Sequence, residues 1–437
     1  MANFGIFFSI ITSIIFWGVV LVTFVRICSQ AGLRLPQTVN RCFIEKITPV
    51  YCQIASFVVR DEVKVILFGA MIRLFILILA FLTLLAANGP PLTFTALFYA
   101  FSGGDVQHYL TLVDIGYSWE TPDGKNVLLA FFPLYVFLVR GVNVFLNNTL
   151  ASAFVVTFLS YLIGLHYIFR LVRLDFDRKI AWWTVILISV APPAFFFGVP
   201  MTESLMLLTS AMTLYYIRTH KWPLAGIAGA LCLFTRMVGA ILIVVAAVEF
   251  IVHYKIFALI QSSEWKEVFR LIGKKGLWIL VMLVGGLAYL YLNWHVSGNP
   301  FQFLYYQRTH WSNVSQYFGQ TISDQFRLIY SQYITAVSTI FLSNVVAFAF
   351  AIFLLAYACI KRLQVTYIVY TLGYVFISFS PSWLLSGARY VVVCIPLFIF
   401  LAHAIRKNST FKALTLSVFL VGLIWLTRAF LVRGLVF

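Results

Sequence analysis

The chain has 437 residues, of which 62% are hydrophobic and only 10% are charged. A soluble domain of this size could not bury so many apolar side chains, so the composition predicts an all-α, polytopic integral membrane protein. The formal net charge of +17 could suggest nucleic-acid binding. The basic residues instead cluster between apolar runs, which indicates positive-inside topology, no nucleic-acid partner and a basic face beside membrane lipid.

The first apolar run, residues 4–25, lacks a basic N-terminal region and a clear cleavage site, which favours a transmembrane helix over a signal peptide. Basic residues then predict a cytoplasmic loop over 26–64 and an outer N-terminus. They are Arg26, Arg34, Arg41, Lys46, Arg60 and Lys64. A second span is expected at 65–87, and the loop around Asp105 that follows it is then extracytoplasmic.

Residues 127–145 are apolar but contain Pro133, Arg140 and Gly141. We interpret this segment as re-entrant or surface-lying, because an odd number of crossings must connect outer Asp105 to the cytoplasmic arginines near Arg173. The other spans are expected at 151–170, 181–197, 202–217, two short crossings in 223–254 that turn near Arg236 and Gly239, 276–294, 333–358, 364–380, 388–405 and 411–430. The total is about 12 spans, with a charged cytoplasmic loop over 255–275.

The pattern suggests two parts. Residues 1–64 form an extra N-terminal transmembrane helix and its basic cytoplasmic loop, and residues 65–437 form the main transmembrane domain with external loops at 88–148 and 295–332. Six scattered cysteines make no CxxC pair, so neither a metal site nor a disulfide framework is expected. They are Cys28, Cys42, Cys52, Cys232, Cys359 and Cys394.

Asp105 follows Gly103 and Gly104, where a loop can turn and enter a helix. In such a helix Asp105, His108 and Tyr109 share one face, because residues three and four apart are neighbours. This face is a candidate site. The alternative is that Asp105 serves only as the N-cap of the helix.

Three more charged residues lie near the outer ends of spans. Glu203 is either a functional acid at membrane depth or a first-turn residue that favours the helix dipole. An unpaired Arg236 or Arg389 would cost about 2.5–3.5 kcal/mol at the bilayer centre. These arginines either bind the phosphate of a lipid-linked donor, which guanidinium groups match well, or they snorkel or pair with acids such as Glu203.

The outer segment 297–311 is rich in aromatic and amide side chains and includes Arg308 and Trp311. Aromatic faces and amides bind sugar rings, so the segment is a candidate saccharide or headgroup platform. The alternative is an amphipathic helix at the membrane interface.

Several motifs carry a resemblance to a known family. The segment Gly104-Asp-Val-Gln-His-Tyr-Leu-Thr-Leu-Val-Asp-Ile-Gly-Tyr117 resembles the "Trp-Asp…His-Tyr-Leu…Gly-Tyr" segment of the GPI mannosyltransferase II (PIG-V) family and its prokaryotic relatives. Further motifs follow in the family's order: Ala130-Phe-Phe-Pro-Leu-Tyr135, Pro200-Met-Thr-Glu-Ser-Leu205, Thr235-Arg-Met-Val-Gly239, Gly298-Asn-Pro-Phe301 with Trp311, and Ala388-Arg-Tyr390 with Pro396. The match covers residues 95–405. The family's Trp before the Asp is Gly104 here, and the first span looks like an addition.

The resemblance implies a membrane glycosyltransferase of the GT-C class. Such an enzyme moves a sugar, here mannose, from a polyprenyl-phosphate donor to a lipid or glycan acceptor on the extracytoplasmic or lumenal face, with inversion. Asp105 would be the general base and Arg236 and Arg389 would bind the donor phosphate. The substrate-binding candidates are His108, Tyr109, Glu203, Arg308 and Trp311. No cofactor is implied beyond the lipid-linked sugar as co-substrate.

The chemistry agrees with this set of residues. One carboxylate suffices to take the proton of an attacking hydroxyl, and a phosphate leaving group needs positive charge rather than a general acid. Two alternatives stay open: a transporter or flippase for lipid-linked saccharide without catalysis, and a subunit that holds a partner enzyme in the membrane. The membrane would be the plasma membrane of a prokaryote or the endoplasmic reticulum of a eukaryote.

Overall fold

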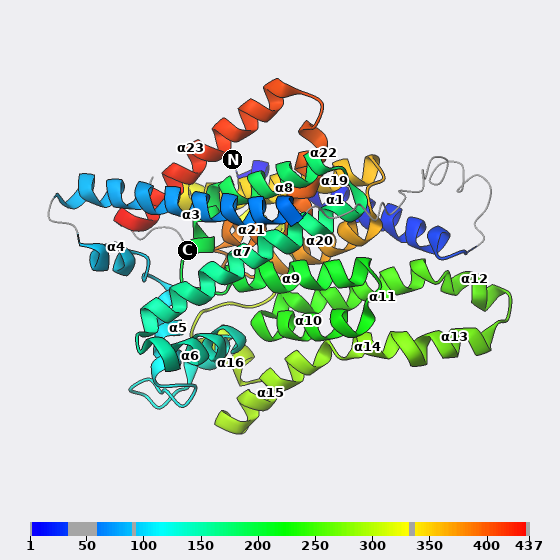
Figure 1. Cartoon of the computed structure of the whole chain (residues 1–437), viewed down its shortest axis with the longest axis horizontal. Coiled ribbons are helices and arrows are strands. Elements are labelled where there is room, and N and C mark those ends of the chain that lie inside the picture. Colours follow the sequence, from blue (N-terminus) through cyan, green and yellow to red (C-terminus); the bar gives the residue numbers. More distant parts are fainter. Residues whose placement is uncertain (1, 34–58, 90–92, 332–336, 434–437) are drawn as a thin grey trace.

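The computed structural model describes residues 2–33, 59–89, 93–331 and 337–433 (Figure 1). Within these ranges the regular structure is helical, and the one β feature is an isolated bridge between Ser315 and Pro381. The all-α class predicted from composition is confirmed. Arg34, Arg41, Lys46, Cys42 and Cys52 lie outside the described residues.

The first half of the chain contains both long and short helices. Their bounds are α1 (Ala2–Gln30), α3 (Val59–Asn88), α4 (Phe94–Ala100), α5 (Asp105–Asp114), η1 (Val127–Ala130), α6 (Leu134–Leu146), α7 (Thr149–Asp175), α8 (Arg178–Val190), η2 (Pro192–Gly198) and α9 (Glu203–Arg218).

The second half continues in the same way. Its bounds are α10 (Trp222–Thr235), η3 (Met237–Ala240), α11 (Ile241–His253), α12 (Ile256–Gln261), α13 (Trp265–Leu271), η4 (Ile272–Gly276), α14 (Leu277–Leu280), α15 (Leu283–Ser297), α16 (Gln302–Thr309), α17 (Phe318–Ser331), η5 (Val337–Phe341), α19 (Leu342–Ile360), α20 (Val365–Ser378), α21 (Gly387–Val393), α22 (Ile395–Ile405) and α23 (Ser409–Arg433).

By length and composition, 6 of the described helices can cross a membrane, or up to 8 if each bent pair is one span. Shorter apolar helices of 10–17 residues accompany them, and a helix lies at each position where a span was expected. The chain is therefore a multi-pass membrane protein. One expected loop is different: residues 255–275 are largely helical, and an apolar helical stretch runs continuously over Trp265–Ser297.

Two expected spans are broken rather than straight. The axes of α8 and η2 differ by 81°, and those of α21 and α22 differ by 74°. A proline lies at each break. It interrupts the helix because it has no backbone N–H to donate and because its ring clashes with the preceding turn. The guanidinium of Arg73 on α3 donates to the carbonyls of Ala194 (2.9 Å) and Ser189 (3.4 Å). It thereby satisfies carbonyls that the first break leaves without helical partners.

The segment after α5 is tied back to the same end of the bundle. Before α6, the backbone N–H of Asn126 donates to the hydroxyl of Tyr306 on α16. After α6, Thr149 donates to Asp114 at the end of α5. Both ends of α6 are thus held beside the loop region that contains Asp105, which agrees with a non-crossing element.

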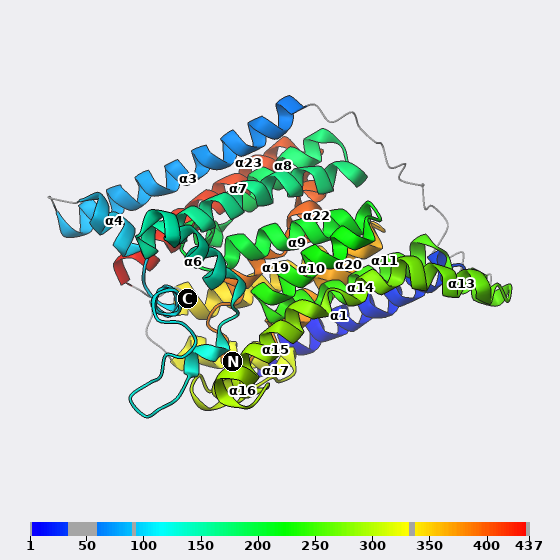
Figure 2. The same ribbon diagram turned by 60° about the horizontal axis from the view of Figure 1, so that its bottom comes forward.

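Polar clusters lie at opposite ends of the bundle. Helix α9 begins at Glu203 and ends at Arg218, and its 16 residues span about 24 Å. Arg218 pairs with Asp175 (2.6 Å), the last residue of α7, and with Glu249 (2.5 Å), which lies near the end of α11. Figures 1 and 2 show α5, α6 and α16 at one end, while α12 and α13 project at the other.

Helix α1 is bonded into the bundle. The hydroxyl of Ser9 donates to the carbonyl of Gly319 on α17 (2.7 Å), and Arg26 donates to the carbonyl of Leu363 before α20 (2.9 Å). The division into parts at residue 64 stays a prediction.

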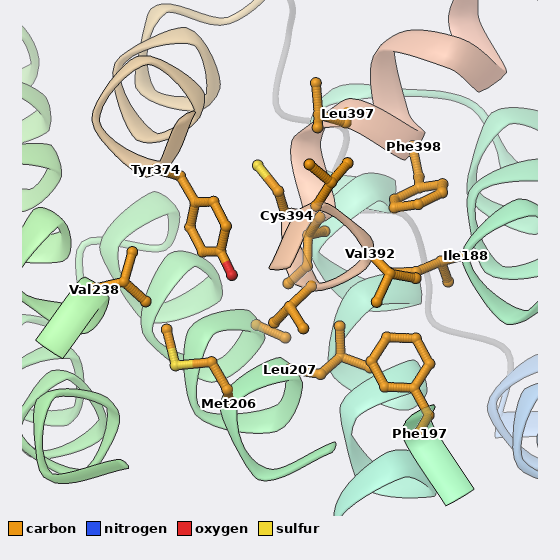
Figure 3. Close-up of a cluster of buried hydrophobic side chains, with 14 of the residues drawn as sticks. Ile188, Phe197, Met206, Leu207, Val238, Tyr374, Val392, Cys394, Leu397 and Phe398 are labelled. Atoms are coloured by element: carbon orange, nitrogen blue, oxygen red, sulfur yellow. The ribbon is translucent and has the colours of Figure 1, made fainter. Parts of the chain in front are cut away.

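The hydrophobic core next to the start of α9 is formed by helices that are far apart in the chain. Figure 3 shows Phe197 of η2, Met206 and Leu207 of α9, and Val392 and Leu397 of α21 and α22 in one buried group. Because protein interiors are close-packed, this contact fixes the start of α9 against the start of α21. Those two helix ends carry Glu203 and Arg389.

Candidate active site

Helix α5 starts at a glycine with an unusual backbone. Gly104 has φ +60° and ψ −133°, a backbone conformation that residues other than glycine rarely adopt. Gly104 occupies the N-cap position, so Asp105 is the first residue of the helix rather than its cap. The N-cap interpretation of Asp105 is therefore wrong. Its carboxylate still lies at a helix N-terminus, where negative charge is favoured.

A chain of ion pairs connects four charged side chains from four parts of the sequence. Arg389 Nη1 lies 2.8 Å from Asp105 Oδ2, and Arg389 Nε lies 2.6 Å from Glu203 Oε1. Arg236 Nη1 lies 2.8 Å from the same Glu203 oxygen. The predicted alternative that the arginines pair with Glu203 is thus observed. It does not remove them from the site, because both also line the cavity described below.

The two side chains at the ends of this series of ion pairs are more exposed to solvent than the two in its middle. The Asp105 side chain is 41% exposed and that of Arg236 is 21% exposed, whereas Arg389 is 5% exposed and Glu203 is 0% exposed. Stacking also orients the arginines: the guanidinium of Arg236 lies 4.8 Å from the ring centre of Tyr390, and that of Arg389 lies 5.3 Å from that of Phe196. Such contacts restrict the arginine rotamers.

The charge of Asp105 is set by its neighbours. Partial burial acts to raise the pKa of this carboxyl, but the Arg389 guanidinium, with smaller contributions from His108 and Arg236, brings the pKa below its ordinary value. Asp105 is therefore a carboxylate at neutral pH. The hydrogen bond from Arg389 uses Oδ2 of Asp105, which leaves Oδ1 for the donor of a ligand.

Asp105, Arg236 and Arg389 line one cavity of about 370 Å³ at the end of the bundle that contains α5, α6 and α16 (Figure 1). Its walls combine charge with aromatic and amide groups. The other lining residues are Tyr109, Ala130, Phe131, Phe132, Thr235, Met237, Val238, Gln307, Trp311, Asn313, Tyr374, Ile377, Ser378, Pro381, Trp383, Leu385, Ser386 and Tyr390.

The other predicted site residues are placed differently from one another. Tyr109 and Trp311 line the cavity with Asp105. His108 is half-buried, does not line the cavity, and contacts the ring of Phe131 at 5.2 Å. Arg308 is exposed on α16 and does not line the cavity, so its substrate role stays a prediction.

Glu203 lies behind the arginines and not on the cavity wall. It begins α9, as the first-turn interpretation expected, and it also pairs with both guanidinium groups. In this geometry Glu203 positions Arg236 and Arg389, and these two arginines, rather than Glu203, face the cavity.

Two segments that line the cavity are hydrogen-bonded to each other. The backbone N–H of Gln316 donates to the carbonyl of Ser380, and that of Ser382 donates to the carbonyl of Val314, both at 2.8 Å. This pairing places Asn313 beside Trp383. Sequence reasoning did not select Asn313, Trp383 or Tyr374. Trp383 lies in a short link between two spans on the predicted outer face, and this position is the signal that could have found it.

No group of three His, Cys, Asp or Glu side chains in the described ranges is arranged to hold a metal ion. The expectations about metals and cofactors stay predictions.

No protein-family model and no curated protein matches the chain. Among solved structures, the chain is similar to ArnT from Cupriavidus metallidurans bound to undecaprenyl phosphate, with TM-score 0.47 and 17% identity over 74% of this chain and 60% of that one. It is also similar to the oligosaccharyltransferase AglB from Archaeoglobus fulgidus in complex with an inhibitory peptide and a dolichol-phosphate, with TM-score 0.39 and 13% identity over 83% and 56%. The chain thus spans less than two thirds of either structure. We base the proposed function on the side chains of the site.

Proposed function

We propose that the chain is an inverting glycosyltransferase that moves a sugar from a polyprenyl-phosphate donor to a lipid or glycan acceptor on the outer face. The observation that carries this proposal is the shared cavity of one ionised carboxylate, Asp105, and two arginines, Arg236 and Arg389, among apolar helices. A carboxylate and two guanidinium groups are the groups that this reaction requires.

The reaction uses each charged group once. Asp105 takes the proton from the acceptor hydroxyl while the hydroxyl oxygen forms a bond to the anomeric carbon of the sugar. The bond from that carbon to the phosphate oxygen breaks, and its electron pair leaves with the polyprenyl phosphate. Arg236 and Arg389 stabilise the charge that develops on the phosphate, most strongly where water is excluded.

The other walls of the cavity suit a sugar. Phe131, Trp311 and Trp383 offer aromatic faces, and Gln307 and Asn313 offer amide donors and acceptors. Apolar faces with a few polar groups are typical of small-molecule sites. The proposal that the sugar is mannose follows the motif resemblance to the PIG-V family.

One observation favours a second candidate, a transporter of lipid-linked saccharide. Transporters commonly use broken helices at their binding sites, and Arg389 lies on α21, one half of a helix pair bent by 74°. A transporter needs the arginines but has no use for a base. The two functions therefore differ in their dependence on Asp105.

The test is sugar transfer by purified protein in liposomes, with radiolabelled polyprenyl-phosphate mannose and an acceptor lipid extract. We expect Asp105→Asn to lower the rate of transfer by about 100-fold or more, because the general base is lost. Asp123→Asn is the matched control, since Asp123 is exposed in the loop after α5 and its partners among the described residues are its neighbours Thr121 and Lys125. Full transfer by Asp105→Asn would remove the base assignment. Movement of intact labelled donor across the bilayer without transfer would favour the transporter.

A further inference from the structure

Arg389 divides its donors between two carboxylates that differ in freedom. Its Nε bonds to Glu203, which is completely buried, and its Nη1 bonds to Asp105, which is 41% exposed and lines the cavity. The hydrophobic group around the start of α9 fixes the Glu203 end of this pairing (Figure 3). Asp105 is thus the partner of Arg389 that can leave.

The four charges of the network also balance before any ligand enters. Two carboxylates face two guanidinium groups, and the Glu203 oxygen that accepts from Arg389 also accepts from Arg236. An anionic phosphate therefore finds Nε and Nη1 of Arg389 already paired with carboxylates. A phosphate that binds through Nη1 competes with Asp105 for this nitrogen and for the positive charge of the guanidinium.

We propose that the donor phosphate replaces Asp105 as the partner of Arg389 and that this exchange releases the carboxylate to act as the base. This inference rests on the proposed function and adds its regulation. With Arg389 as partner, Asp105 is a weak base; beside a phosphate and without the guanidinium, its proton affinity rises. The base is thereby activated only when a donor is bound.

Each charged or titratable group near Asp105 has a stated place in this exchange. Arg389 is the shared partner, and Arg236 and Glu203 belong to the same ion-pair chain. On α5 itself, Tyr109 lines the cavity and His108 lies one turn from Asp105. Burial lowers the pKa of His108, although Asp105 acts against this shift. The nearby His310 also acts to lower the pKa of His108. His108 therefore needs its own control.

The exchange predicts proton uptake when polyprenyl phosphate binds. By linkage, a phosphate that raises the pKa of Asp105 binds more tightly as pH falls. We would titrate the detergent-solubilised protein with polyprenyl phosphate alone, at about pH 5 and about pH 7, in buffers of different ionisation enthalpy. Wild type should take up more protons than Asp105→Asn at the lower pH. His108→Gln should still take up more protons than Asp105→Asn at the lower pH, because it keeps the Asp105 carboxylate.

Asp105→Asn should also bind polyprenyl phosphate about ten-fold more tightly than wild type at neutral pH, equivalent to about 1.4 kcal/mol. The reason is that the competing carboxylate is gone. Equal proton uptake in wild type and Asp105→Asn, or weaker binding by this variant, would overturn the exchange and leave the proposed function standing. Failure of any form to bind polyprenyl phosphate would overturn the proposed function as well. Elution volume and thermal unfolding of each variant check that it is folded.

Discussion

At the scale of single residues, Glu203 has the most demanding position. One of its oxygens accepts from both Arg236 and Arg389, while the other has no hydrogen-bond partner among the described residues. The side chain is completely buried. A buried carboxylate in such a place depends on the guanidinium groups it pairs with.

Replacement of this carboxylate should be costly. We expect Glu203→Gln to lower the free energy of unfolding by about 3–5 kcal/mol, because the buried Arg389 and the partly buried Arg236 lose their common counter-charge. Denaturant titration in detergent measures the change. Glu120→Gln is the matched control, since Glu120 is exposed in the loop between α5 and η1 and accepts a long hydrogen bond from Asn126 (3.5 Å). Equal stability of the two variants would show that Glu203 does not hold the arginines.

At the scale of elements, the placement of Asp105 depends on how α5 begins. Gly103 and Gly104 both have open space where a Cβ would lie, but only Gly104 has a positive φ. A larger residue at Gly104 therefore meets no neighbour and acts through backbone strain alone. The two glycines form a natural pair for experiment.

Gly104→Ala should lower the free energy of unfolding by about 1–3 kcal/mol, because the alanine must adopt a sparsely populated backbone conformation. Transfer activity should fall too, since a shift at the start of α5 moves the carboxylate of Asp105 away from Arg389. Gly103→Ala should change both quantities little. Denaturant titration and the transfer assay measure them together. If both variants retain wild-type stability and rate, the geometry at Gly104 does not set the position of Asp105.

The predicted elements show where sequence patterns suffice. A helix from Asp105 and a turn near Arg236 were expected, and the structure has α5 from Asp105 and a break between α10 and η3 at Arg236. Local composition determines both, through Gly-Gly in one case and a charge within an apolar run in the other. The bends of 81° and 74° were not expected. Hydropathy averages over Pro192 and Pro396, whereas the backbone responds to the missing N–H of each proline.

At the scale of the whole molecule, the site combines residues that no local pattern connects. Arg236 and Arg389 were selected because a charge among apolar residues needs a partner, and Asp105 was selected because it follows two glycines and shares a helix face with His108 and Tyr109. The pairing of Asp105 with Arg389 was not predicted, since these residues are 284 positions apart. Spacing along one helix indicates neighbours on that helix only, and the contact between η2, α9 and α21 arises from tertiary packing.

The two-ended arrangement makes a prediction about orientation. Asn299 lies exposed beside α16 at the end that contains the site, and Ser263 lies exposed between α12 and α13 at the other end. In a variant without its native cysteines, Asn299→Cys should react with a membrane-impermeant thiol reagent in intact cells, whereas Ser263→Cys should react only after lysis. This result is expected because the Ser263 end carries the basic loops. The reverse pattern would place the site on the cytoplasmic face.

The length of α9 has a consequence for the surrounding lipid. Its charged ends are about 24 Å apart, whereas the hydrocarbon layer of a typical bilayer is about 30 Å thick. Glu203 at one end and the Arg218 cluster at the other cannot both lie at headgroup level unless the bilayer thins locally. Hydrophobic mismatch of this kind is relieved in bilayers with short acyl chains. Lipid thickness thus becomes a determinant of how deeply an acceptor must descend to reach Asp105.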